Sequence, residues 1–220
     1  MRKRYFFFDI DGTLAAGPIM GRYIPESTKR ALEILESEGH FLAICTGRLH
    51  AMGEGFMHEL GFQNMVADGG NSLTLNGEFL GIKPLDTQAC IDVIEECERL
   101  GVVWAISFDD SRRRWTRYAN YDALVHDSYM ETVVDPELDY RSIECFYKVY
   151  VICSPEEEAR IASLSKVPTA RFSPYAVFVE PVDKGEGIKR CMARLGAPIE
   201  DVVVFGDGSN DVCMFLPEWT

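Results

Sequence analysis

The sequence has little positive charge for its size. Its 220 residues contain 22 lysines and arginines against 35 aspartates and glutamates, which gives a formal net charge of −13. Proteins that bind nucleic acid or anionic membranes mainly through charge need a basic surface. We therefore expect neither a nucleic-acid partner nor a membrane partner. The basic cluster Arg112-Arg113-Arg114, which Trp115 and Tyr118 accompany, is interpreted as a solvated turn.

Other features are missing as well. The seven cysteines are odd in number and form no CxxC pair, and the four histidines lack the spacing of a zinc site. No apolar run is long enough to span a membrane, and the run that follows the basic amino terminus is interrupted by Asp9 before it reaches the length of a signal-peptide core. These absences favour a cytoplasmic protein with reduced thiols.

Two carboxylates follow the first apolar run of the chain. Asp9 and Asp11 come directly after Tyr5-Phe6-Phe7-Phe8, and Gly12 then allows a turn. Residues two apart point to the same face of a strand, so both carboxylates can reach one site. Oxygen ligands without nearby histidine or cysteine point to Mg²⁺. The alternative interpretation is an exposed turn, in which aspartate and glycine are common.

The first part of the chain alternates between strands and helices. Apolar patterns predict strands at 5–8, 41–45 and about 64–67, with helices beginning near residue 25 and after residue 48. Asn76-Gly77 between two short apolar runs predicts a hairpin. The alternation returns at the end, with a helix over 184–195 and a strand over 202–205.

The pattern changes between residues 84 and 180. Here we expect a helix over 87–100, strands at 102–108, 146–153 and 175–180, and a helix from Pro155, with irregular polar sequence between the first two strands. Mixed order of this kind is typical of an α+β module. The sequence therefore predicts an α/β core domain over 1–83 and 181–220 that carries an inserted domain over 84–180.

Polar residues follow three of the predicted strands. They are Asp9 and Asp11 after the first, Thr46-Gly47-Arg48 after the second, and Asp207, Asn210 and Asp211 after the last. Ligands bind at the carboxyl ends of strands in an open parallel sheet. Each group alone is also explained as a loop or a helix cap, but three such groups favour a shared site.

A phosphate monoester suits such a site. We expect Mg²⁺ to be held by the carboxylate of Asp9, the backbone carbonyl of Asp11 and Asp207. Asp9 would attack phosphorus, and Asp11 would protonate the leaving alcohol and later activate water, provided that its pKa lies near the working pH. The predicted phosphate ligands are Thr46, Gly47, Lys184 and Asn210.

Two of these residues carry a further interpretation. Asp211 is predicted to support the site from behind, by orienting Asp207, metal-bound water or Lys184. Lys184, taken without its context, is more typical of the protein surface.

Four ordered motifs carry a family resemblance: Asp-Ile-Asp-Gly-Thr, Cys-Thr-Gly-Arg, Asp-Lys-Gly and Gly-Asp-Gly-Ser-Asn-Asp. Together they resemble the haloacid dehalogenase superfamily, and the place of the insertion is similar to that in its Cof-type, class IIB phosphatases. The resemblance implies a Rossmann-like parallel-sheet core with an inserted α+β cap of the C2B type. It implies Asp9 as nucleophile, Asp11 as general acid and base, Thr46 and Lys184 as phosphate ligands and Asp207 as metal ligand. Superfamily dehalogenases lack the second aspartate, so Asp11 favours a phosphatase.

The chain departs from the family pattern in two places. Relatives commonly have Asn-Gly where this chain has Asp68-Gly69-Gly70. The family also continues well beyond its last motif, whereas the chain here runs to Thr220. We therefore expect the strand over 202–205 to be incompletely covered and the natural product to be longer, or else a marginally stable or self-associating chain.

The predicted function is hydrolysis of a small phosphorylated metabolite, such as a sugar phosphate, through an aspartyl-phosphate intermediate. A phosphomutase of the same superfamily is one alternative, because an acyl phosphate can be passed to a sugar instead of water. A catalytically idle, truncated binding protein is the other. The sequence leaves open the individual substrate, the cap residues that contact it, and the oligomeric state.

Overall fold

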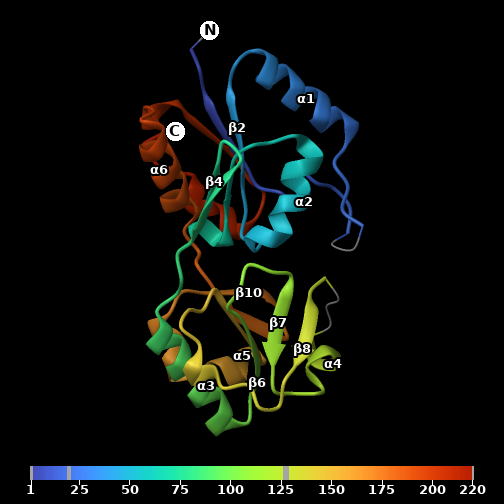
Figure 1. Cartoon of the computed structure of the whole chain (residues 1–220), viewed down its shortest axis with the longest axis vertical. Helices are drawn as coiled ribbons and strands as arrows, with labels where there is room; N and C mark the ends of the chain where they lie inside the picture. Colours follow the sequence, from blue (N-terminus) through green and yellow to red (C-terminus); the bar gives the residue numbers. More distant parts are fainter. Residues whose placement is uncertain (1, 19–20, 126–128, 220) are drawn as a thin grey trace. The chain divides into compact units, whose positions relative to one another are not determined.

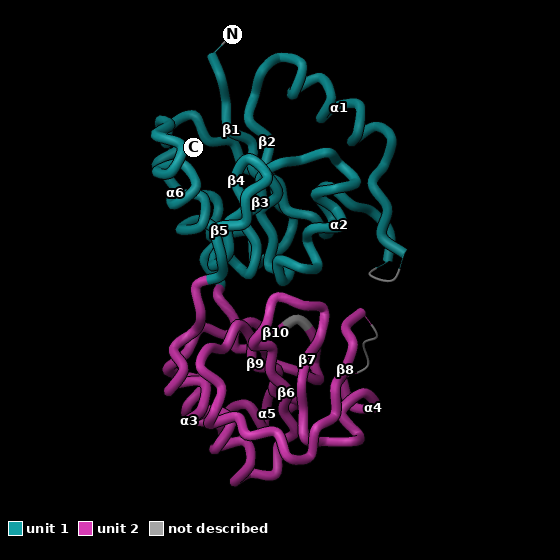
Figure 2. Tube along the Cα trace, viewed as in Figure 1, with its two compact units in different colours: residues 1–82, 182–220 teal, residues 83–181 magenta. Residues whose placement is uncertain are grey.

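The structure, a computed structural model, describes residues 2–18, 21–125 and 129–219. It divides into two compact units, which Figure 2 colours separately. Unit 1 comprises Met1–Ile82 and Val182–Thr220, and unit 2 comprises Lys83–Pro181. Unit 2 is therefore an insertion between the fifth strand of unit 1 and its last helix.

A sheet in the order β12-β1-β2-β3-β4-β5 forms the centre of unit 1. The first four of these strands are parallel, and β4 and β5 add an antiparallel hairpin at one edge. The bounds are β12 (Val202–Phe205), β1 (Tyr5–Phe8), β2 (Phe41–Cys45), β3 (Met65–Ala67), β4 (Ser72–Leu75) and β5 (Glu78–Ile82). This is the mostly parallel α/β core that the alternating pattern predicted.

Helices cover both faces of this sheet, which explains why its central strands are continuously apolar. Helices α1 (Glu26–Ser37) and α2 (His50–Leu60) lie on one side in Figure 1, and α6 (Lys184–Leu195) lies on the other. Alternate residues of β1 separate accordingly, because Phe7 joins the buried cluster that contains Ile188 of α6 and Phe8 joins the one that contains Leu32 of α1. The carboxyl ends of the parallel strands are left for the polar residues.

The predicted hairpin forms at Asn76-Gly77. Both residues have positive φ, 52° and 78°, as a tight two-residue turn between twisted strands requires. The turn joins β4 to β5, and Gly77 N–H donates to the carbonyl of Gln63.

Unit 2 is built on a second sheet, in the order β10-β11-β9-β6-β7-β8. Its neighbouring strands are antiparallel except for the parallel pair β7 and β8. Its core contains Trp104 and Val151 of the sheet and Ile94 of the long helix α3. The bounds are β6 (Val103–Ser107), β7 (Arg113–Thr116), β8 (Glu131–Val134), β9 (Lys148–Ile152), β10 (Thr169–Ser173), β11 (Ala176–Val179), α3 (Thr87–Leu100), α4 (Tyr121–Val125) and α5 (Pro155–Glu158).

The interpretation of the arginine cluster as a solvated turn is wrong for Arg113 and Arg114, whereas Arg112 is exposed in a bend before β7. Arg113 and Arg114 begin β7, and the side chain of Arg114 is buried. Its Nε donates to Thr132 Oγ1 at 2.8 Å, its Nη2 lies 3.4 Å from Asp122 Oδ1, and its guanidinium stacks 4.8 Å from the centre of the Tyr121 ring. Pairing partners distant in sequence supply the hydrogen bonds that bury this cation, and they leave no local pattern.

The sequence also missed structure in unit 2. The stretch predicted as irregular contains β7, α4 and β8, and the strand β10 was not predicted. In unit 1, the last three residues of the final motif and the three residues after them form the 3₁₀ helix η5 (Ser209–Met214).

Strand β12 lies at the edge of its sheet, with its two faces covered unequally. Val202 is buried with Met214 and Trp219, whereas Phe205 is 44% exposed and stacks on Phe8. In the part of the chain that the structure describes, no helix combines the length and apolar character needed to cross a bilayer.

Candidate active site

The carboxyl ends of β1 and β12 bring three carboxylates together. Asp9 follows β1, while Asp207 and Asp211 follow β12, and their oxygens lie within 4.8 Å of one another. Asp9 and Asp211 are buried and Asp207 is exposed. The cluster thus combines two buried carboxylates with one that is exposed to solvent.

Lys184 joins the buried carboxylates. Its Nζ donates to Asp9 Oδ1 at 2.7 Å and to Asp211 Oδ1 at 2.5 Å, and the side chain is almost completely inaccessible. Burial raises the pKa of Asp9, and the charge and hydrogen bond of Lys184 act against that rise. The paired carboxylates in turn raise the pKa of Lys184 despite its burial. The interpretation of Lys184 as a surface residue does not apply here.

Helix α6 reaches this position because glycines let it approach its neighbours closely. A Cβ at Gly185 would lie 2.3 Å from the carbonyl oxygen of Cys213, and one at Gly187 would lie 2.5 Å from Val66. Asp183 caps the helix by accepting the N–H of Glu186 at 2.9 Å. The close packing fixes the first turn of α6, which carries Lys184.

The loop after β12 is organised by Asp211. Its Oδ2 accepts the N–H groups of Asp207 at 3.0 Å and Gly208 at 2.9 Å. Asp211 therefore orients both the Asp207 loop and Lys184, in addition to offering an oxygen to the three-carboxylate cluster. Thr13 donates to Asp207 Oδ1 at 3.0 Å, a contact that sequence reasoning did not assign.

Gly12 permits the approach of the first loop to Asp207. Its φ is +95°, and a Cβ there would lie 2.2 Å from Asp207 Oδ2. Any larger residue would meet both a backbone penalty and a direct clash.

Asp11 does not join the three carboxylates through its side chain. It pairs instead with two arginines: Arg48 donates from Nε to Oδ2 and from Nη2 to Oδ1, both at 2.7 Å, and Arg22 Nε lies 3.0 Å from Oδ1. Burial raises the pKa of Asp11, but the hydrogen bond and charge of Arg48, with the charge of Arg22, outweigh it and lower the pKa overall.

Neither arginine was assigned to the site from the sequence. Arg48 had a signal, because it ends the Thr46-Gly47-Arg48 motif, but Arg22 belongs to no motif. In the structure, its guanidinium reaches Asp11 from across the loop.

The predicted phosphate ligands lie around the same strand ends. Thr46 follows β2 with its side chain buried, and its Oγ1 accepts the N–H of Arg48 at 3.1 Å. A Cβ at Gly47 would lie 3.7 Å from Asn210 Nδ2, so these two residues are neighbours across the site. The structure thus brings all the predicted residues to one edge of the sheet.

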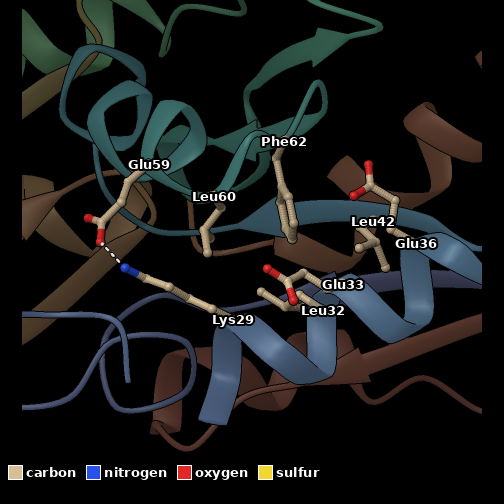
Figure 3. A pocket seen from close by; sticks show the side chains of 8 residues that line it. All are labelled: Lys29, Leu32, Glu33, Glu36, Leu42, Glu59, Leu60 and Phe62. Carbon is tan, nitrogen blue, oxygen red and sulfur yellow. Dashed lines mark ion pairs between the residues drawn. The ribbon is translucent and has the colours of Figure 1, made fainter. Parts of the chain in front are cut away.

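A separate small pocket lies on the α1 and α2 side of the sheet (Figure 3). Its volume is about 100 Å³, and Lys29 and Glu59 form a 3.3 Å ion pair at its rim. The side chains that line it are Lys29, Leu32, Glu33, Glu36, Leu42, Glu59, Leu60 and Phe62. It shares no residue with the acidic cluster, so we place no chemistry in it.

A model of the haloacid dehalogenase-like hydrolases matches residues 6–216. The chain belongs to this family.

Individual relatives agree with this assignment. The sequence is 26% identical over 223 residues to a Bacillus subtilis strain 168 protein named "Putative phosphatase YkrA", covering 97% of this chain and 83% of that protein. A solved protein from Geobacillus kaustophilus HTA426 superposes with a TM-score of 0.80 at 28% identity, covering 97% and 83% of the two chains. The fold is also that of the subclass IIB sugar phosphatase BT4131, with a TM-score of 0.74 at 23% identity over 96% and 84%.

Proposed function

We propose that this protein is a Mg²⁺-dependent phosphatase that hydrolyses a small phosphorylated metabolite through an aspartyl-phosphate intermediate. The observation that carries the proposal is the position of Asp9, a buried carboxylate at the end of β1 that Lys184 holds beside Asp207 and Asp211. Family membership supports the reaction class.

The donor set fits a magnesium ion. The three clustered side chains offer carboxylate oxygens, which hard divalent cations prefer, and contain neither histidine nor cysteine. We propose Asp9 and Asp207 as ligands, with Asp211 beside them and the backbone carbonyl of Asp11 as a further donor. When bound, the ion would neutralise the negative charge of the site and of the phosphoryl oxygens.

Counting charges supports an anionic substrate in the metal-bound form. Four aspartates and three cations, Lys184, Arg48 and Arg22, surround the site. These side chains carry one net negative charge, and a divalent cation would reverse that sign. The site then suits a phosphate monoester. Thr46, Gly47, Lys184 and Asn210 are the proposed phosphate ligands.

The residues then divide the reaction into two steps. An oxygen of Asp9 attacks phosphorus, the ester P–O bond breaks, and Asp11 gives its proton to the leaving alkoxide. Water then attacks the phosphoryl group and loses its proton to Asp11, which regenerates Asp9 and releases inorganic phosphate. Arg48 lowers the pKa of Asp11 in the structure, so the acid role requires that this pKa rise in the substrate complex, and the negative charge of a bound phosphate acts in that direction.

Unit 2 is the proposed cap that selects the substrate. It is inserted between β5 and α6, and α6 carries Lys184 at its first residue. Replacing residues 83–181 with a short linker should change selectivity among metabolites more than activity on a small aryl phosphate. Unchanged selectivity would reject the cap role.

The test of the function is phosphate release from a panel of phosphorylated metabolites with MgCl₂. Asp9→Asn should abolish release, because the amide keeps the shape but loses the nucleophile. Asp201→Asn is the matched control: Asp201 is another buried aspartate in ion pairs, but it precedes β12, and its partners are Arg2 and Arg4. The control should stay active, and circular dichroism should show both variants folded. Wild-type activity in Asp9→Asn would reject the mechanism.

Metal binding has a readout of its own. MgCl₂ should raise the melting temperature of the wild type. At a concentration one hundred times the dissociation constant, the expected gain in the free energy of unfolding is about 2.7 kcal/mol. Asp207→Asn should remove most of that increase. An equal increase in both proteins would reject Asp207 as a ligand.

A further inference from the structure

Asp68 has an unusual backbone conformation in a buried position. Its φ is +51°, in the left-handed region that non-glycine residues seldom adopt, and its side chain is 2% exposed. A left-handed aspartate is tolerated better than most residues, but a buried carboxylate needs hydrogen bonds to offset its lost hydration. Such a residue persists where the surrounding contacts hold it, and these conformations concentrate at functional sites.

Asp68 makes hydrogen bonds to the backbone of Arg48 and of His50. Its carboxylate Oδ2 accepts the N–H of His50 at 3.0 Å, and its own N–H donates to the carbonyl of Arg48 at 2.8 Å. Leu49, the N-cap residue of α2, offers no side-chain hydrogen bond to the helix. Asp68 thus supplies the acceptor that the first N–H of α2 lacks, and it fixes the backbone on both sides of residue 49.

Residues 68–70 also contact the end of β2 and the helix α6 on the other side of the sheet. Gly69 N–H donates to the Thr46 carbonyl at 3.2 Å, and its own carbonyl accepts the N–H of Asp183 at 3.0 Å. Arg190 of α6 donates to the carbonyl of Gly70 at 2.5 Å. Because α2 and α6 lie on opposite sides of the sheet (Figure 1), residues 68–70 link the loop of Arg48 to the start of α6.

Arg48 in turn fixes the side chain of Asp11. Its guanidinium makes two hydrogen bonds of 2.7 Å to the carboxylate, a geometry that a long and flexible side chain keeps only when its backbone is fixed. We propose that Asp68 is a positioning residue that holds Arg48, and through it Asp11, for the phosphatase reaction. This inference rests on the proposed function.

Two substitutions separate the carboxylate from the backbone conformation. Asp68→Gly keeps the left-handed conformation but removes the acceptor, whereas Asp68→Asn keeps both the conformation and an acceptor oxygen. We expect kcat to fall about tenfold in Asp68→Gly, the lower end of the usual effect of a supporting residue, with KM nearly unchanged. Asp68→Asn should retain most of the wild-type kcat. A loss confined to KM, or an equal loss in both variants, would overturn the assignment.

A double-mutant cycle tests whether Asp68 acts through Arg48. Arg48→Met removes the guanidinium and keeps the stem, so Asp68→Gly should cause no further loss of kcat in that background. A tenfold loss in both backgrounds would show that Asp68 only stabilises α2, and would overturn the inference. Ser154→Gly, which removes the cap of α5 in unit 2, is the matched control for a lost cap and should leave kcat unchanged.

The design distinguishes this inference from the proposed function. If the wild type releases phosphate and Asp9→Asn does not, the function stands and the cycle in kcat decides the role of Asp68. If the wild type releases none, the function fails, and the same cycle is measured in melting temperature. Non-additive melting shifts of Asp68→Gly and Arg48→Met would then support their coupling, and additive shifts would reject it.

Discussion

Gly70 should be a point where a single methyl group disturbs both stability and activity. Its φ is +109°, and a Cβ at this position would lie 2.1 Å from the carbonyl oxygen of Asp183 and 3.3 Å from the Cα of Lys184. The neighbouring atoms are backbone, so they can move only if the start of α6 moves. Gly70→Ala therefore pushes directly on the segment that carries the site lysine.

The expected cost has two parts. A left-handed alanine costs about 1–2 kcal/mol relative to glycine. Overpacking against backbone adds about 1–3 kcal/mol, for a total of roughly 2–5 kcal/mol. Gly39→Ala isolates the first part, because Gly39 has φ +81° and nothing within 4 Å of its Cβ position. The smaller freedom of alanine in the unfolded chain offsets both costs by about the same 0.4–1 kcal/mol, so it cancels in the comparison.

Denaturant unfolding and thermal melting of both variants provide the measurement. Gly70→Ala should lose about 1–3 kcal/mol more than Gly39→Ala, the overpacking part of the cost. At about 2–4 °C for each kcal/mol in a chain of this size, its melting temperature should also fall further. Phosphate release should fall only in Gly70→Ala. Equal losses of stability, or full activity in Gly70→Ala, would refute the close approach of residue 70 to the start of α6.

Three other results are expected. Lys184→Met leaves the buried Asp9 and Asp211 without their cation and should cost about 3–5 kcal/mol in urea unfolding, and a cost below about 1 kcal/mol would contradict the buried ion pairs. The backbone and hydroxyl of Ser163 donate to Glu96 and lower its pKa below the ordinary 4.5. A carboxyl whose pKa is lower in the folded state than in the unfolded state stabilises the fold at any pH above its unfolded-state pKa. That stabilisation is lost as the pH falls through the folded-state pKa. The difference in melting temperature between the wild type and Glu96→Gln should therefore be largest near pH 7 and vanish in acid, and a difference that grows in acid would contradict the contact. Burial raises the pKa of most of the cysteine thiols, so a thiol reagent should label about two of the seven rapidly and the rest only after unfolding, and rapid labelling of four or more would contradict the packing. The two partly exposed thiols are Cys145 and Cys213.

Much of unit 1 could be predicted because its signals are local. The strand over 5–8, the strand over 41–45, the helix over 184–195 and the strand over 202–205 have the predicted bounds. Continuous apolar runs suit strands buried on both faces, and glycines end the helices α2 and α6 in left-handed caps. The order of these elements was enough to predict that the polar strand ends share one edge of a sheet.

Unit 2 was harder because its elements are held by distant partners. The strand β7 is short and rich in arginine, and the burial of Arg114 depends on Asp122 and Thr132, which no local pattern connects to it. The charge and polarity of these residues indicated a solvent-exposed segment, but pairing between strands placed them in the sheet.

The sequence by itself determined the family, the α/β core and the residue types that meet at the strand ends, because periodicity and ordered motifs are written along the chain. Only the tertiary structure decided how those residues pair. Lys184 lies between Asp9 and Asp211. Asp11 accepts hydrogen bonds from Arg48, and Asp68 accepts the N–H of His50 in the segment that follows Arg48. Such pairings depend on the direction in which each side chain leaves its own element. Elements far apart in sequence meet only when the core packs, so the spacing of residues along the chain holds no record of these directions.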